Sequence, residues 1–193
     1  LFDLDLATGV FLGRQGLFVR AAEALDRAQT GLERRPDPAR EWELWRSRGD
    51  LARRRDDPVS AAAAYQRCLV LSEGRGEADR TAESRLLLCA ALLDQGSFAT
   101  ARDLLADGRD EAFGGRFRTR LSAALLRGAA EVQAGRFREA LLELNDARRM
   151  CRPGSPPDLV ARIELEAGRA HAALGEPVAA RKAYAAAAAI APE

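Results

Sequence analysis

Residues 161–192 have the sequence ARIELEAGRAHAALGEPVAARKAYAAAAAIAP, and this stretch holds the pattern that decides the fold. Gly175 suits the end of a helix, where the chain often needs a residue in the left-handed conformation. Pro177 follows at a place where a new helix begins and its missing N–H loses no hydrogen bond. Spacings of four and three then put three residues on one stripe of that second helix, namely Ala180, Tyr184 and Ala187. The stretch therefore predicts two antiparallel helices joined by a tight turn.

The same pattern occurs five times, in units that begin at residues 2, 42, 82, 121 and 161. The eighth residue of each unit is small: Gly9, Gly49, Cys89, Gly128 and Gly168. The fifteenth is glycine or aspartate: Gly16, Asp56, Gly96, Gly135 and Gly175. The twentieth is always alanine: Ala21, Ala61, Ala101, Ala140 and Ala180. The twenty-fourth is large (Leu25, Tyr65, Leu105, Leu144, Tyr184) and the twenty-seventh small (Ala28, Cys68, Gly108, Ala147, Ala187). Such a register predicts a stack of helix pairs in which the small residues lie where two helices approach closely.

The pattern predicts an all-α protein with about ten helices and no strand. We expect them near residues 2–14, 17–32, 40–54, 58–72, 79–95, 98–108, 116–134, 137–150, 157–174 and 177–190. The prolines support these boundaries, because none interrupts a predicted helix. Pro58 and Pro177 fall at second-helix starts, and the others fall in predicted loops or at the end: Pro36, Pro38, Pro153, Pro156, Pro157 and Pro192.

On these residues the sequence resembles the tetratricopeptide repeat proteins. Gly168, Gly175, Ala180, Tyr184 and Ala187 carry the family's small-residue, glycine and aromatic pattern in the last unit. The period of about 40 residues exceeds the family's usual 34, as in its longer-period members. The resemblance implies an α-solenoid of about five helix-turn-helix repeats with a right-handed superhelix. It covers essentially the whole chain, which we expect to be a single array, residues 1–193, excerpted from a longer protein.

The resemblance also implies where a partner would bind. The first helices of such repeats line a concave surface, and the family's ligand positions are the second, fifth, ninth, twelfth and thirteenth of each unit. The charged, polar and large apolar residues at these positions form the predicted partner-binding set: Arg14, Glu43, Arg46, Asp50, Arg53, Arg54, Leu86, Leu93, Asp94, Val132, Gln133, Arg162 and Arg169.

Within this set, the arginines of the second unit suggest a peptide site. Arg46, Arg53 and Arg54 share a helix face with Asp50, and their guanidinium groups suit an acidic or carboxylate-bearing segment. Two alternatives remain open. The charges could form solvated surface pairs of little energetic value. The apolar members could pack between helices instead of contacting a ligand.

Composition and motifs narrow the function. The chain has 30 Lys plus Arg against 29 Asp plus Glu, a net charge of +1 that disfavours nucleic acid as the partner. We expect a protein-interaction scaffold for a partner protein, a peptide or other domains of the same chain. The alternative is a sensor or regulatory array within a larger bacterial signalling or transcription-regulating protein, and a helical-repeat RNA binder is a weaker third.

Catalytic and metal-binding patterns are absent from the sequence. It contains no phosphate-binding loop and no dinucleotide-binding motif, so we expect no enzyme and no cofactor. Cys68, Cys89 and Cys151 are widely spaced and His171 is the one histidine, which predicts packing roles in place of a disulfide framework or a metal site. We expect no membrane insertion, because no apolar run approaches roughly 20 residues, and a cytoplasmic location.

The register makes a direct prediction about packing. Ala101 and Ala140 should each be buried between the two helices of their own unit. Replacing either with leucine should lower the free energy of unfolding by about 1–3 kcal/mol, because a larger side chain forces the helices apart. Thermal or urea unfolding measures the change. A melting temperature that neither substitution alters would show that the register is wrong.

Overall fold

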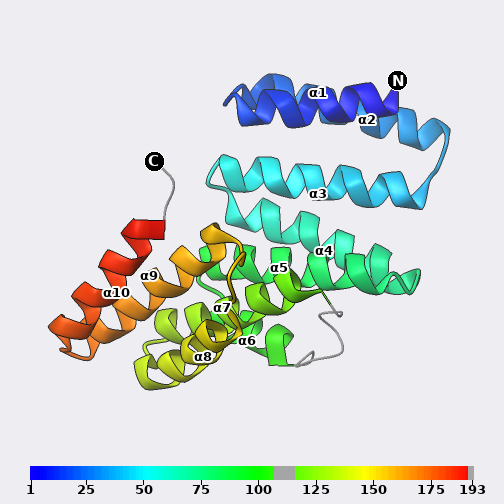
Figure 1. Ribbon diagram of the computed structural model, residues 1–193. Coiled ribbons are helices and arrows are strands. Elements are labelled where there is room, and N and C mark those ends of the chain that lie inside the picture. The colour runs from blue at the N-terminus through cyan, green and yellow to red at the C-terminus, as the bar shows by residue number, and fades with distance from the viewer. Residues whose placement is uncertain (107–115, 191–193) are drawn as a thin grey trace. The chain divides into compact units, whose positions relative to one another are not determined.

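The structure is a computed structural model, and it describes residues 1–106 and 116–190. These residues form ten α-helices and no strand, which confirms the all-α prediction (Figure 1). The helices are α1 Phe2–Arg14, α2 Phe18–Arg34, α3 Pro38–Arg54, α4 Pro58–Gly74, α5 Ala78–Asp94, α6 Phe98–Ala106, α7 Phe117–Gln133, α8 Phe137–Met150, α9 Pro157–Ala173 and α10 Pro177–Ile190. The predicted end of the sixth helix, Gly108 and Pro192 lie outside the described residues.

The chain divides into two compact units, each larger than one repeat: the first unit is Leu1–Gln95 and the second unit is Gly96–Glu193. In the first unit α1 packs on α2 and α3 on α4, while α2 contacts α3 and α4 contacts α5. In the second unit α7 packs on α8 and α9 on α10, and α8 contacts α9. The first helices of successive pairs also touch, α1 with α3 and α7 with α9. Each unit is therefore a stack of helix pairs in which neighbours bury each other's apolar faces.

The turn inside each repeat has the predicted backbone conformation. All five residues at the fifteenth position have positive φ: 75° at Gly16, 57° at Asp56, 84° at Gly96, 75° at Gly135 and 74° at Gly175. The one non-glycine residue is an aspartate, a residue type that tolerates the left-handed region better than most. The next helix follows within two residues in every case.

One proline does not lie where the sequence suggested. Pro38 was expected in a loop, but it is the first residue of α3. Pro157 is the first residue of α9, where the predicted helix 157–174 begins. A proline suits this position because its fixed φ matches the helix and the first N–H groups have no intrahelical partner. Asp37 completes the start of α3, since its side chain accepts hydrogen bonds from the backbone N–H groups of Ala39 and Arg40.

In four of the five repeats the eighth residue is a glycine that meets the twenty-fourth residue of the same repeat. A Cβ atom added to Gly49 would lie 2.4 Å from the ring of Tyr65, and one added to Gly128 would lie 2.5 Å from Leu144. The same close approach joins Gly9 to Leu25 and Gly168 to Tyr184. The glycine hydrogen is the largest substituent that fits here, so these glycines set how closely the two helices of a repeat approach.

The twentieth and twenty-seventh positions complete the packing. Ala21, Ala61, Ala101 and Ala140 are 0% exposed and Ala180 is 4% exposed, which confirms their predicted burial. Cys68 and Cys89 are buried among the helices and Cys151 is partly buried. Burial raises the pKa of Cys68 and of Cys89 to about 12, so both thiols stay protonated at neutral pH and serve as small packing groups.

The glycine contacts predict opposite effects for two Gly→Ala substitutions. Gly128→Ala should lower the free energy of unfolding by about 1–3 kcal/mol, because the new methyl group collides with the fully buried Leu144. Gly31→Ala in α2 is the matched control, since no side chain lies within 4 Å of its added Cβ. It should leave stability unchanged or raise it by up to about 1 kcal/mol through helix propensity. Equal effects in urea unfolding would contradict this account of the eighth position.

Candidate functional site

Five predicted partner-binding residues gather around one groove of the first unit. The groove lies between α1 and α3 and has a volume of about 290 Å³. It is lined by Leu6, Val10, Arg14, Trp42, Glu43, Arg46, Ser47 and Asp50. A small extension of about 60 Å³ shares Val10, Arg14, Ser47 and Asp50 with it and adds Arg54. We call these two spaces together the α1–α3 groove.

Three of the charged groups in the α1–α3 groove already have partners. Glu43 pairs with Arg80 at 3.6 Å, and Arg46 pairs with Glu83 at 3.1 Å. The hydroxyl group of Tyr65 donates a hydrogen bond to Asp50 Oδ1 at 2.7 Å. Burial and the nearby charge of Asp50 raise the pKa of Tyr65, so the phenol stays a neutral donor. These partners hold both acidic groups of the groove in place.

Two arginines of the α1–α3 groove remain unpaired. Arg14, in the last turn of α1, and Arg54, in the last turn of α3, form no ion pair with any residue that the structure describes. Both side chains are exposed, and they line the same small extension of the groove. Because their guanidinium groups have no carboxylate partner among the described residues, this end of the groove can receive an anion.

Arg53 does not line the groove. Its guanidinium group pairs with Asp94 at the end of α5, at 2.9 Å. Arg46 and Arg53 thus both bridge α3 to α5, with partners about one repeat away in the sequence. Both pairs are exposed and are worth at most about 1 kcal/mol each. For these two arginines the structure shows the surface pairing that the sequence left open as an alternative.

Trp42 forms a stronger link between the same two repeats, and sequence reasoning missed it. Its indole N–H donates a hydrogen bond to Ser84 Oγ at 2.9 Å, and both residues are buried. The guanidinium groups of Arg46 and Arg80 lie 5.7 Å and 4.9 Å from the indole ring centroid, a cation–π arrangement. A tryptophan at the start of one unit and a serine near the start of the next were the available signals.

The other predicted residues are distributed over both units. Leu86 on α5 is partly buried, while Leu93 is only 6% exposed and packs inside the first unit. In the second unit Val132 packs against the core around α7, α8 and α9, and Gln133 is exposed. On α9 Arg162 is exposed and Arg169 pairs with Glu166 at 2.7 Å.

The described residues offer no metal site and no membrane-spanning helix. No three His, Cys, Asp or Glu side chains among them gather closely enough to hold an ion. His171 Nδ1 lies 2.6 Å from Glu176 Oε2, a contact that ties the end of α9 to the turn before α10. None of the helices within residues 1–106 and 116–190 is both long and apolar enough to cross a membrane.

The stacked helix pairs and the groove between first helices define a helical-repeat protein. No protein-family model and no curated protein matches the sequence. Among solved structures, the crystal structure of the apo form of RapI is similar to this chain, with a TM-score of 0.84 at 12% sequence identity. The match covers 98% of this chain and 69% of that chain. At this identity the likeness shows the fold.

The two kinds of link between repeats should differ in energy. Ser84→Ala leaves the buried indole N–H of Trp42 without its acceptor and should cost about 1–3 kcal/mol of unfolding free energy. Arg53→Ala removes an exposed ion pair and should cost less than about 1 kcal/mol. Urea unfolding of both variants measures the difference. If Arg53→Ala proved the more damaging substitution, the exposed pairs would be the main link between these repeats.

Proposed function

We propose that this chain is a protein-interaction scaffold that binds a carboxylate-bearing segment of a partner protein in the α1–α3 groove. The observation that carries the proposal is the pair of unpaired guanidinium groups, Arg14 and Arg54, at one end of that groove. A helical-repeat fold supports it in general, because stacked helix pairs form extended grooves that suit peptides.

The end of the groove that Arg14 and Arg54 line suits a carboxylate group. An arginine fork donates two parallel hydrogen bonds to a carboxylate, a geometry that a lysine cannot reproduce. Leu6 and Val10 are half-buried on the α1 side and offer apolar contact to the residues next to the carboxylate. The ligand we propose therefore combines an acidic group with aliphatic or aromatic neighbours.

The fixed acidic groups favour a selective peptide over a general polyanion. Asp50 and Glu43 place two carboxylates along the groove, where a second or third anionic group of the ligand would be repelled. Only two unpaired cations then contribute to binding. Affinity should fall with salt, but less steeply than for a nucleic acid held by many phosphate contacts.

Replacing both unpaired arginines tests the proposal. A displayed library of peptides with free C-termini selects binders of the wild-type chain, and fluorescence anisotropy then measures each affinity. The double variant Arg14→Ala, Arg54→Ala should bind these peptides at least about tenfold more weakly, because two charge-assisted contacts are lost. Its melting temperature should stay unchanged, since neither side chain pairs with a described residue.

A charge-matched variant serves as the control. Arg20 and Arg34 on α2 are exposed and lie outside the groove, so Arg20→Ala, Arg34→Ala removes the same charge without touching it. This control should keep wild-type affinity. If both double variants bind equally well, or if the selected peptides carry no acidic group, the α1–α3 groove is not the carboxylate site.

A further inference from the structure

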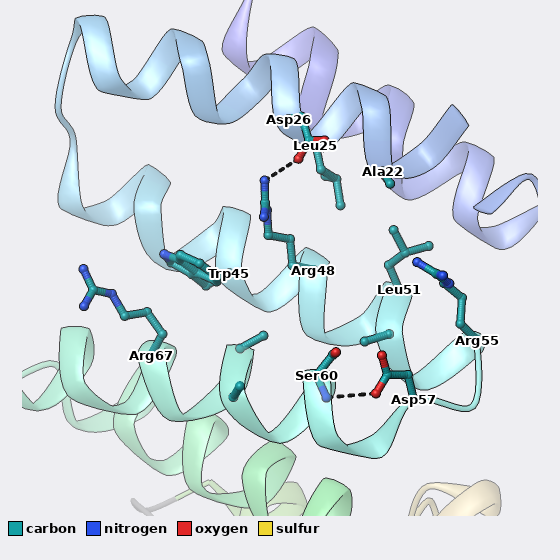
Figure 2. A pocket seen from close by; sticks show the side chains of 13 residues that line it. Ala22, Leu25, Asp26, Trp45, Arg48, Leu51, Arg55, Asp57, Ser60 and Arg67 are labelled. Atoms are coloured by element: carbon teal, nitrogen blue, oxygen red, sulfur yellow. Dashed lines mark hydrogen bonds and ion pairs between the residues drawn. The ribbon is translucent and has the colours of Figure 1, made fainter. Parts of the chain in front are cut away.

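A larger cavity lies between α2, α3 and α4 of the first unit, separate from the α1–α3 groove. Its volume is about 510 Å³, within the usual range for small-molecule pockets. Figure 2 shows α3 crossing the cavity between α2 and α4, with Arg67 and Arg55 at its two ends. We call this space the α2–α4 cavity.

The floor of the α2–α4 cavity is apolar and built from small residues. Ala22 of α2, Ala52 of α3 and Ala63 of α4 line it together with Leu25 and Leu51. Alanine side chains leave the room that larger residues would fill. A flat apolar group of a ligand can therefore lie against this floor and lose its contact with water.

The rim carries planar groups that attract an aromatic ring. Trp45 is half-buried at one side, and the guanidinium group of Arg48 lies 5.4 Å from its ring centroid. Arg48 also pairs with Asp26 across the cavity at 2.6 Å (Figure 2). Indole and guanidinium planes both stack well on aromatic rings.

One arginine of the α2–α4 cavity has no ion-pair partner among the described residues. Asp26 pairs with Arg48, and Arg67 pairs with Glu41 at 3.3 Å. Asp57 accepts a hydrogen bond from the Ser60 N–H and so caps α4. Arg55 is exposed and forms no ion pair with any described residue. Three arginines and two aspartates line the cavity, and Arg55 is the lining arginine that forms no ion pair with a described residue. The hydrogen bonds from Ser60 and the nearby charge of Arg55 lower the pKa of Asp57, so this carboxylate offsets part of the charge of Arg55.

The next repeat lacks this combination of residues. Forty residues further on, Arg85, Leu88, Leu92 and Gln95 stand at the positions of Trp45, Arg48, Ala52 and Arg55. Leu92 is larger than Ala52, Leu88 has no guanidinium group, and Gln95 carries no charge. The third repeat therefore lacks the side chains that line this cavity in the second.

We propose that the α2–α4 cavity binds a small aromatic molecule with one carboxylate group. The ring lies on the alanine floor beside Trp45, and the carboxylate meets the guanidinium group of Arg55. A single unpaired cation matches a single negative charge, which favours a monocarboxylate over a phosphate or a polyanion. Among the described residues, Leu51 is the one that lines both this cavity and the α1–α3 groove.

The two tryptophans provide a built-in test by nitrogen-15 NMR. The indole N–H signal of Trp45 should report binding in the cavity, while that of Trp42, which lines the α1–α3 groove, should report binding there. Trp45→Phe assigns the two signals. Three probes separate ring from charge: N-acetylphenylalanine, its uncharged amide and acetate. N-acetylphenylalanine should shift the Trp45 signal saturably and bind about tenfold more tightly than either other probe.

Two exposed arginines give a matched pair of variants. Arg55→Gln should weaken N-acetylphenylalanine about tenfold and leave the affinity of the amide unchanged, because only the carboxylate contact is lost. Arg20→Gln, on α2 and outside both cavities, should behave as wild type. Ala52→Leu introduces the residue that the next repeat carries as Leu92 and should weaken both ring-bearing probes by filling the floor.

The proposal fails on either of two results. The first is the absence of a saturable Trp45 shift with N-acetylphenylalanine while the chain remains folded by circular dichroism. The second is equal affinity of the Arg55→Gln and Arg20→Gln variants, which would show that the carboxylate binds elsewhere.

Discussion

The close approach between the eighth and twenty-fourth residues of a repeat is the constraint on which the structure depends. Gly49 against Tyr65 and Gly128 against Leu144 leave no room for a Cβ atom, so the two helix axes are as near as these side chains allow. Nearby alanines such as Ala140 are fully buried for the same reason. This short separation brings the other facing side chains of the two helices into contact.

The contact between Gly49 and Tyr65 also positions the carboxylate of Asp50. The ring of Tyr65 fills the space beside Gly49, and its hydroxyl group then reaches Asp50, the next residue of α3. The core therefore orients a carboxylate in the α1–α3 groove without any separate binding element. In the last repeat Tyr184 packs on Gly168 in the same way, but the next residue is Arg169, which pairs with Glu166. One packing rule thus supports different surface chemistry in different repeats.

The sequence predicted what recurs and missed what occurs once. The left-handed turn at Asp56 and the burial of Ala101 followed from five aligned units, because each unit repeats the same physical demand. The hydrogen bond from Trp42 to Ser84 joins residues 42 positions apart and has no counterpart in the pattern. The same reason explains why some of the predicted arginines are paired and others are not. Whether a guanidinium group has an ion-pair partner depends on which acidic residue the next repeat presents.

The end of α3 explains how one helix can serve two cavities. Consecutive residues of an α-helix point about 100° apart, so neighbours at a helix end reach different surfaces. Arg53 turns toward α5 and pairs with Asp94, Arg54 lines the α1–α3 groove, and Arg55 lines the α2–α4 cavity. Three consecutive cations look in the sequence like one basic run. In the structure Arg53 forms an ion pair between repeats, while Arg54 and Arg55 lie in two separate cavities and pair with no described residue. The net charge of the chain therefore does not indicate what this protein binds.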